Sequence, residues 1–311
     1  MKTIQITIIG LLLLIMLNVT AQQAPMYTHY MYNTLVVNPA YAGSRDALTV
    51  TGINRRQWVD FKGAPVTQSI TIHSPLTNEH VGLGFSIMND KIGISNSTNF
   101  ALAYAYRFNL TMESKLSLGL SAGLNIMQAD LTQLELNEQN DPAFMNDLNN
   151  HLIPNVGFGA YYSRERFYAG FSVPNLLQTR YSNIDPDGNV LEAMDKRHYF
   201  FIMGALFNLT DYLGFKPTSL VKMTPGAPIE LDLTGMFVIH DRFYAGAMFR
   251  SGDAFGGLVG FDITEQLHLG YSYDWSYGLQ TSVYNKGSHE LVLRYDFLFR
   301  NRKQIHSPRN F

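Results

Sequence analysis

Residues 116–126 read LSLGLSAGLNI, so every second position is apolar and the positions between are small or polar. Successive side chains of a β-strand point to opposite faces, and this stretch therefore predicts a strand with one apolar and one polar face. The same alternation returns in residues 100–108, 267–275 and 291–299. A chain built of such strands is typical of a closed β-barrel, whose apolar face contacts lipid and whose backbone groups pair within the sheet.

The first 21 residues have the features of a secretory signal peptide. Lys2 gives a positive start, residues 4–17 are nearly all apolar, and residues 19–21 read VTA, which fits the small-residue cleavage pattern. The mature chain is therefore expected to begin near Gln22. The apolar run is shorter than the roughly 20 residues of a membrane-spanning helix. We predict Sec-type export to the bacterial outer membrane, with strands rather than helices crossing the bilayer.

The composition excludes several classes of protein. The chain contains no cysteine, so neither disulfides nor thiolate metal sites are available to it. Its formal net charge is -2 and no long basic patch occurs, so nucleic-acid binding has no electrostatic support. Charged residues make up only 15% of the chain and aromatic residues 13%. This balance fits an outer-membrane barrel, in which about half of each strand is polar.

Alternation and turn residues together predict about 14 strands, and an even number is usual for bacterial single-chain barrels. The expected fold is an all-β, transmembrane, antiparallel up-and-down β-barrel over residues 47–299. Its strands are expected at residues 47–59, 66–73, 80–89, 98–110, 115–128, 154–162, 166–173, 198–209, 218–223, 228–238, 242–251, 255–263, 266–274 and 289–299.

The lengths of the connections test this topology independently. In a barrel with both termini in the periplasm, short turns follow even-numbered strands and long loops follow odd-numbered ones. The longest expected connections, residues 129–153, 174–197 and 275–288, follow strands five, seven and thirteen. A soluble sandwich or propeller gives no reason for such sorting. Residues 210–217, after strand eight, form a longer connection than the rule predicts.

The first strand departs from strict alternation. Ile53 and Trp58 fall on opposite phases around residues 54–57. We interpret this departure as a β-bulge or an early exit from the bilayer.

Two segments lie outside the predicted barrel. Residues 22–46 precede the first strand, and residues 300–311 form a basic tail; in this topology both face the periplasm. Each is expected either to fold into the lumen or to contact a partner, and a solvated end is the alternative for the tail. The candidate luminal or partner-binding residues are Tyr27, Tyr30, Tyr32, Asn38, Pro39, Tyr41 and Arg309.

Several charged residues occupy the polar phase of their strands or lie at strand ends, so they are expected to point into the lumen. Because both signs are mixed, internal salt bridges are favoured over a selectivity filter. These residues are Arg107, Glu230, Asp232, Arg250, Asp274, Arg294 and Asp296.

No catalytic, cofactor or metal site is expected. The nine histidines show no pair at the helical i, i+4 spacing of a zinc protease. One Gly-x-Ser-x-Gly string occurs at residues 119–123, but it lies in the middle of a predicted strand. A nucleophile elbow needs a sharp strand-to-helix turn to expose its serine, so we interpret the string as a chance match.

Further motifs connect the chain to a known family. They include NPAYAGSR at residues 38–45, GYSYD at 270–274, GSHEL at 287–291 and the closing SPRNF at 307–311. In combination they resemble the PorP/SprF family of Bacteroidetes outer-membrane proteins, and the resemblance spans nearly the whole mature chain. Asn310 departs from the aromatic residue expected at that position.

The resemblance implies a part in the type IX secretion and gliding-motility machinery. Family members are expected to anchor, or to help export, a secreted protein or surface adhesin that carries a C-terminal sorting domain. They are also expected to work with periplasmic ring and motor components, without a cofactor. Two alternatives stay open at this point, which are a passive porin for small solutes and a barrel enzyme that uses Ser121.

Overall fold

The computed structural model describes residues 25–76, 79–133, 147–178, 180–184, 190–194, 196–277 and 285–298. Nearly all of its regular structure is β. The strands of the main sheet are β1 (Leu48–Arg56), β2 (Val66–Pro75), β3 (Val81–Ile92), β4 (Ser95–Asn109), β5 (Ser114–Ala129), β6 (Leu148–Arg164), β7 (Phe167–Val173), β10 (Tyr199–Ala205), β11 (Phe207–Asn208), β12 (Leu213–Met223), β13 (Glu230–Ile239), β14 (Phe243–Arg250), β15 (Ala254–Asp262), β16 (Leu267–Ser276) and β17 (Ser288–Phe297). A separate hairpin consists of β8 (Arg180–Ile184) and β9 (Val190–Met194), and a 3-10 helix, η2 (Leu131–Gln133), follows β5.

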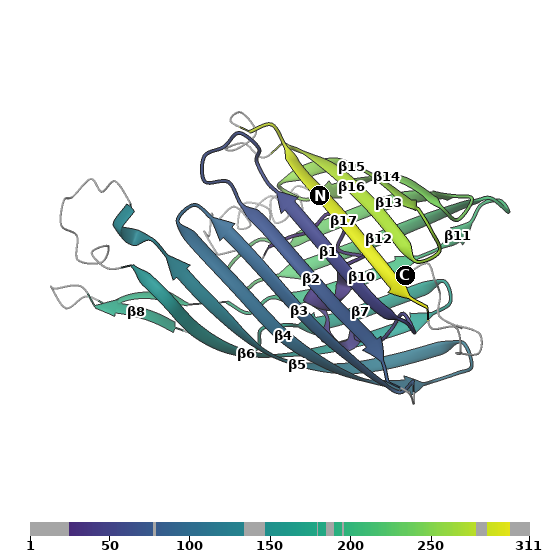
Figure 1. The fold of residues 1–311 in the computed structure, drawn as a ribbon, viewed down its shortest axis with the longest axis horizontal. Helices are drawn as coiled ribbons and strands as arrows, with labels where there is room; N and C mark the ends of the chain where they lie inside the picture. Colours follow the sequence, from purple (N-terminus) through teal and green to yellow (C-terminus); the bar gives the residue numbers. More distant parts are fainter. Residues whose placement is uncertain are drawn as a thin grey trace, which may run out of the picture.

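The main sheet closes into an antiparallel barrel (Figure 1). Strands that follow one another in the chain pair with each other, and β1 pairs with β17. The ring is completed by β10, which pairs with both β7 and β12. β10 and β11 are two parts of one strand interrupted at Leu206, so this described sheet contains fourteen barrel strands. The predicted fold class and strand number are confirmed.

The two faces of the barrel have the polarity that alternation predicted. In β5, Leu118 and Leu120 are 39% and 61% exposed, whereas Ser117 is 1% exposed. Exposed leucine, phenylalanine and tyrosine side chains recur on the outward phase of the other strands, while threonine, serine and charged side chains are buried on the inward phase. This inversion of a soluble protein's pattern is what a lipid-facing barrel requires.

The longest connections lie where the loop-length rule predicts, although residues 93–94 and 251–253, after the third and eleventh strands, are also short. After even-numbered strands the connections cover only residues 76–80, 110–113, 165–166, 209–212, 240–242 and 263–266. The longest, residues 130–147, 174–198 and 277–287, follow the fifth, seventh and thirteenth strands. Short turns are periplasmic in such barrels. We therefore call the end with the short turns the periplasmic end and the opposite end the outer end.

The ninth strand begins earlier than predicted. β12 starts at Leu213 rather than at residue 218, so the connection after the eighth strand is short after all. The predicted connection, residues 210–217, ended at Pro217. In the structure Pro217 pairs with Gly235 on β13, but on its other side it lies at the interruption between β10 and β11, where no ladder pair includes it and its missing N–H is not needed.

The predicted bulge in the first strand is wrong. β1 pairs with β2 and β17 without a register shift. Ile53 breaks the polar pattern because it points into an interior that contains apolar groups, where it is 4% exposed. Trp58 lies beyond the end of the strand.

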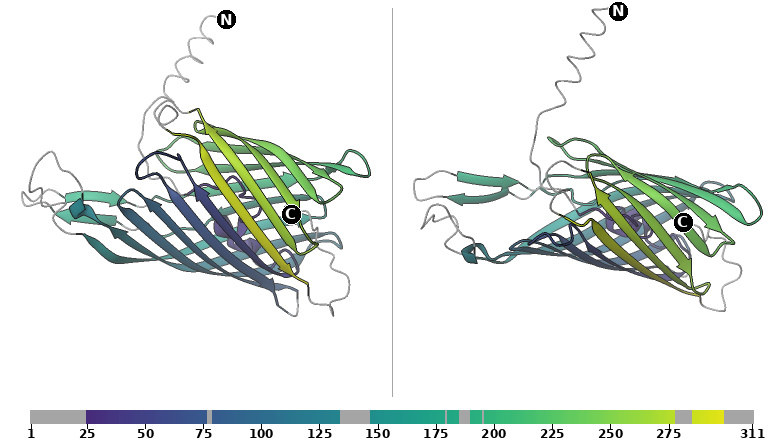
Figure 2. Two further views of the ribbon diagram at one scale, coloured as in Figure 1. Left: turned by 45° about the horizontal axis from the view of Figure 1, so that its top comes forward. Right: turned by 90° about the horizontal axis from the view of Figure 1, so that it is seen from above.

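The interior of the barrel is filled by residues 25–47, which we call the luminal segment (Figure 2). It contains a one-turn helix, α2 (Thr34–Val37), and a 3-10 helix, η1 (Pro39–Tyr41). Its apolar side chains form one core with inward-facing residues such as Ile202, Leu220 and Met236. Among the described residues, no helix is long and apolar enough to cross a membrane.

Candidate functional site

The luminal segment runs from one end of the barrel to the other. Pro25 lines a cavity together with Pro174 and His198, which belong to the long connection after β7 at the outer end. Ala47 directly precedes β1, which starts at the periplasmic end. The first described residues therefore lie at the outer end, whereas the topology predicted from the sequence had residues 22–46 facing the periplasm. The segment carries many aromatic side chains, and a path through the lumen removes them from contact with water. This burial of apolar surface favours the observed position.

The structure places the candidate residues of this segment inside the barrel. The hydroxyl groups of Tyr30 and Thr218 on β12 are 2.9 Å apart. The ring centroid of Tyr32 lies 4.4 Å from that of His268 on β16. Arg309 lies outside the described residues. The buried candidates are Tyr27, Tyr30, Tyr32, Asn38, Pro39 and Tyr41.

Asn38 fixes the turn of the segment against β6 and β7. Its side chain accepts a hydrogen bond from the backbone N–H of Ala40, at 3.0 Å, and so caps η1. Its amide donates to the carbonyl of Ala160, also at 3.0 Å. On β7 the hydroxyl of Ser172 donates to the carbonyl of Val37 at 2.6 Å. Backbone groups of the segment are thus satisfied by the barrel wall.

Glycines on the inward phase let the segment approach the wall. A Cβ atom added at Gly82 would lie 2.0 Å from the carbonyl oxygen of Ala42. At Gly119 it would lie 2.3 Å from the backbone nitrogen of Ala40. Any larger residue at these positions would collide with the backbone of the luminal segment.

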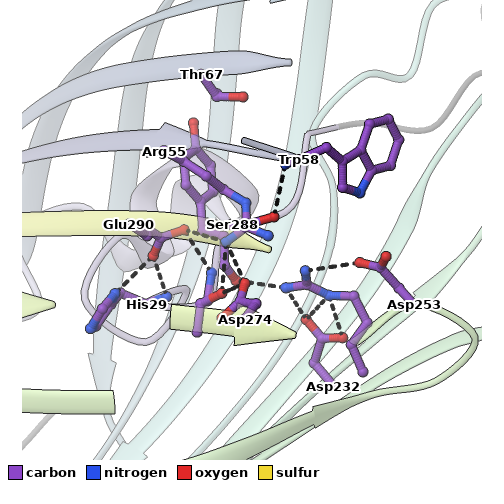
Figure 3. A network of polar contacts seen from close by, with 12 residues as sticks. His29, Arg55, Trp58, Thr67, Asp232, Asp253, Asp274, Ser288 and Glu290 are labelled. Atoms are coloured by element: carbon purple, nitrogen blue, oxygen red, sulfur yellow. Dashed lines mark hydrogen bonds and ion pairs between the residues drawn. The ribbon is translucent and has the colours of Figure 1, made fainter. Parts of the chain in front are cut away.

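A buried charge network holds the outer half of the segment (Figure 3). Arg55 on β1 donates hydrogen bonds from Nη1 to Asp274 at 2.7 Å and to Glu290 at 3.2 Å. Glu290 also accepts from the backbone N–H groups of Thr28 and His29, at 2.9 and 2.6 Å. The hydroxyl of Thr28 donates to Asp274 at 2.7 Å. The segment is thus part of the network.

A second ion pair extends this network. Arg250 on β14 donates to both carboxylate oxygens of Asp232 on β13, at 3.0 to 3.1 Å. The same guanidinium reaches the carbonyl of Tyr27 at 3.3 Å and the carboxylate of Asp253 at 3.4 Å. Figure 3 shows Asp232 next to the Arg55 network.

A separate cluster holds the segment near the periplasmic end. Arg45 pairs with Asp296 on β17 at 2.9 Å. Asp296 also accepts a hydrogen bond from Thr49 on β1, at 2.7 Å. On β4, Arg107 donates to the carboxylate of Asp46 at 2.7 Å. The luminal segment is therefore held by hydrogen bonds to buried carboxylates at its outer end and by ion pairs at its periplasmic end.

Two of these contacts cross the junction of β1 and β17, which we call the closing seam because it joins the first and last barrel strands. Arg55 and Glu290 face each other across it, and so do Thr49 and Asp296. The seam thus has side-chain links in addition to its backbone ladder.

The loops at the outer end continue the seam beyond the strands. The N–H of Val59 donates to the carbonyl of Gly287, and the N–H of Lys286 donates to the carbonyl of Val59, both at 2.9 Å. The ammonium group of Lys286 donates a hydrogen bond to the carboxylate of Asp60, which raises the pKa of Lys286.

The charged residues selected from the sequence lie where their strand phase predicts, and each is in an ion pair. Glu230 pairs with Lys222 on β12 and is only partly buried. Arg294 contacts Asp296 at 3.4 Å. The buried members are Arg107, Asp232, Arg250, Asp274, Arg294 and Asp296.

Sequence reasoning missed the centre of the network, which is Arg55, Glu290 and His29. Arg55 lies on the same inward face of β1 as Thr49 and Thr51. The bulge predicted for this strand left the direction of the Arg55 side chain undetermined. Glu290 is on the inward phase of β17, and only its place in a family motif was noticed. His29 carries no periodic signal, because the luminal segment is not a strand.

Nothing in the described structure supplies the geometry of an enzyme elbow at the Gly-x-Ser-x-Gly string. Ser121 lies within β5, eight residues before the end of the strand at Ala129, and not at a strand-to-helix turn. Within the described ranges, no group of three or more His, Cys, Asp or Glu side chains is arranged to hold a metal ion.

The comparisons with known proteins concern nearly the whole chain. The family model described as Type IX secretion system membrane protein PorP/SprF matches residues 19–295. No curated protein sequence matches.

The similar solved structures are outer-membrane barrels and channels. They include Omp33 from Acinetobacter baumannii, with 11% identity, coverage of 82% of this chain and 100% of that chain, and a TM-score of 0.45. The CymD monoaromatic hydrocarbon channel has 10% identity, coverage of 87% and 94%, and a TM-score of 0.46. A Pseudomonas aeruginosa FadL homologue has 12% identity, coverage of 81% and 89%, and a TM-score of 0.41.

Proposed function

Because the chain belongs to the PorP/SprF family of type IX secretion system membrane proteins, we propose that this outer-membrane barrel binds one secreted protein or surface adhesin and anchors it or assists its export. The partner is a protein with a C-terminal sorting domain. Periplasmic ring and motor components of the secretion and gliding machinery contact the periplasmic end. The role is non-enzymatic.

The observation that carries this proposal is the filled lumen. The luminal segment is buried along most of its length. At the outer end its backbone N–H groups donate to the buried carboxylate of Glu290, and at the periplasmic end Arg45 and Asp46 form ion pairs with the wall. A passive porin needs a continuous aqueous path, and the segment occupies the space where that path would run. The filled lumen therefore supports a protein that works through its surfaces rather than by passing solutes.

The first experiment is deletion of the gene in the native bacterium. We expect the deletion to abolish surface display or export of one secreted protein, while uptake of small hydrophilic solutes stays at the wild-type level. The secreted and cell-surface proteins of both strains are compared by quantitative mass spectrometry, and the wild-type gene is returned as the control. Unchanged secretion together with reduced solute uptake would contradict the proposal.

Conductance in planar lipid bilayers separates the proposal from the porin alternative. The purified wild-type barrel should show no large, steady conductance, because the luminal segment fills the interior. A stable open-channel current from the unmodified protein would favour the porin.

A further inference from the structure

Two histidine rings approach each other in the lumen beside Gly270 on β16. His29 belongs to the luminal segment and His268 to the wall, and each residue is 1% exposed. A Cβ atom added at Gly270 would lie 3.2 Å from Nε2 of His29 and 3.4 Å from Nε2 of His268. The two Nε2 atoms thus lie close to one point, although they come from distant parts of the chain. We call this pair of rings the two-histidine site.

A carboxylate holds each ring at its other nitrogen. Nδ1 of His29 lies 2.8 Å from the carboxylate of Glu290 on β17, as Figure 3 shows, and Nδ1 of His268 lies 2.6 Å from that of Asp262 on β15. An ionised carboxylate only accepts hydrogen bonds, so Nδ1 carries the proton in both rings. In a neutral ring Nε2 then keeps its lone pair. The site therefore brings two lone pairs together.

Neither lone pair is used within the described structure. Nε2 of His268 is buried and has no hydrogen-bond partner there, and the side-chain hydrogen bonds of His29 involve only Nδ1. Gly270 pairs with Gly260 on β15, so neither strand places a side chain over this point. Burying an unsatisfied polar atom costs free energy. An electrophile between the rings would remove that cost.

The carboxylates favour a metal ion as this electrophile. A histidine that binds a metal ion usually donates its second nitrogen to a carboxylate, a carbonyl or water, which fixes the ring and makes it a better ligand. Both rings of the site have this arrangement. Imidazole nitrogens bond zinc at about 2.0–2.1 Å, and an ion of similar size beside Gly270 is within reach of both Nε2 atoms.

The number of ligands and the nearby charges select a monovalent ion. Structural zinc takes four ligands, and in the described part of the chain no third His, Cys, Asp or Glu side chain completes a metal-binding group. The ring of Tyr32, which lies 4.4 Å from that of His268, has Arg294 and Lys216 at 5.2 and 5.5 Å from its centroid. These cations disfavour a doubly charged ion. Copper(I) is monovalent and binds two nitrogen ligands in a line.

We propose that His29 and His268 bind one copper(I) ion through their Nε2 atoms and that this ion links the luminal segment to β16. Glu290 and Asp262 are positioning residues, which orient the rings and offset the charge of the ion. Because one ligand belongs to the segment and the other to the wall, the site is complete only when the segment is seated in the lumen. The ion therefore stabilises the filled state of the barrel.

Metal titration of the purified barrel tests this site. Silver(I) serves as the redox-stable probe, and copper(I) is titrated without oxygen against a coloured chelator of known affinity. The wild type should bind one ion that His29→Gln and His268→Gln each bind at least about a hundredfold more weakly, since even a second-shell change costs about ten- to a hundredfold. His240→Gln is the matched control, because His240 is exposed in the turn between β13 and β14. It should bind like the wild type.

Asp262→Asn tests the positioning role. It should weaken binding about ten- to a hundredfold and leave the stoichiometry at one ion. The folding of every variant is verified by the heat-dependent gel mobility of the barrel. Equal affinity of folded His268→Gln and the wild type would overturn the proposal.

X-ray absorption spectroscopy of the copper(I) complex needs only the wild-type protein. It should show two nitrogen ligands and no sulfur. A shell that contains sulfur would assign the ion to methionines instead. Absence of any tightly bound ion would also contradict the proposal, and would mean that a water molecule bridges the two rings.

Discussion

Glu290 is the residue through which the luminal segment and the closing seam are joined. Its carboxylate lies against Arg55 and accepts hydrogen bonds from two backbone N–H groups of the segment, and its side chain is 0% exposed. Removing one partner of a buried ion pair leaves the other charge uncompensated, which costs about 3–5 kcal/mol.

We therefore expect Glu290→Gln to lower the free energy of unfolding by about 3 kcal/mol or more. Urea titration of the barrel in lipid vesicles, followed by tryptophan fluorescence, measures this quantity. Glu113→Gln is the control, because the Glu113–Arg164 pair is exposed and solvent screens it, so that variant should unfold like the wild type. Equal stability of the two variants would mean that the network does not hold the barrel.

A substitution at Gly82 tests whether the luminal segment needs the space that this glycine leaves at the barrel wall. A side chain at this position would meet the carbonyl of Ala42 at 2.0 Å. Gly82→Val should therefore displace the luminal segment and convert a nearly non-conducting barrel into one with steady single-channel current in planar bilayers. Gly257→Val is the matched change, since the nearest atom to a Cβ there is 4.0 Å away, on Trp275. A silent Gly82→Val barrel would show that a side chain at this position does not displace the luminal segment.

For individual residues, strand alternation predicted the inward-facing charges of regular strands, such as Asp274 and Arg294. It failed at Arg55 because an inward isoleucine beside it, Ile53, looked like a break in the pattern. That isoleucine is explained only by an apolar occupant of the lumen, which alternation within one strand does not reveal.

Among the elements, the strands were the most predictable part of the molecule. Alternation and turn residues together predicted fourteen strands, since a strand between lipid and lumen changes polarity at nearly every residue. The ninth strand was predicted to begin at residue 218, after Pro217, whereas β12 begins at Leu213. Proline is tolerated within β12 because the neighbouring strand is interrupted between β10 and β11.

The luminal segment is the element whose position the sequence did not determine. It has no strand periodicity, and its tyrosines fit a solvated strap as well as a buried one. A double-cysteine variant tests its observed place. Because the chain has no cysteine of its own, Tyr32→Cys with His268→Cys should be joined by a short bismaleimide, and the linked peptides should be found by mass spectrometry.

The control for this crosslink pairs Tyr32→Cys with Leu269→Cys. Leu269 is next to His268 on β16 but faces outward, where it is 38% exposed. No link should form across the wall. Crosslinking of the control pair, or its absence in both pairs, would contradict the buried position of the segment.

For the molecule as a whole, the parity of loop lengths predicted both closure and orientation. The orientation, combined with the path of the luminal segment, places Pro25 at the outer end. In intact cells Pro25→Cys should therefore react with a membrane-impermeant maleimide. Met112→Cys, in the short turn between β4 and β5, should react only after the cells are lysed. The reverse pattern would mean that the barrel is inserted the other way round.

The N-terminal part of this chain runs through a barrel that the rest of the chain forms, and this arrangement limits the order in which the protein can assemble. If the ring were shut first, the free end would have to be drawn through a channel already crowded with side chains. Seating the leading portion against the curved, still open sheet avoids that barrier, and the first and last edges then zip together over it. Biogenesis in the cell envelope is therefore expected to pass through an open-sheet intermediate in which the N-terminal segment is already bound to the strands.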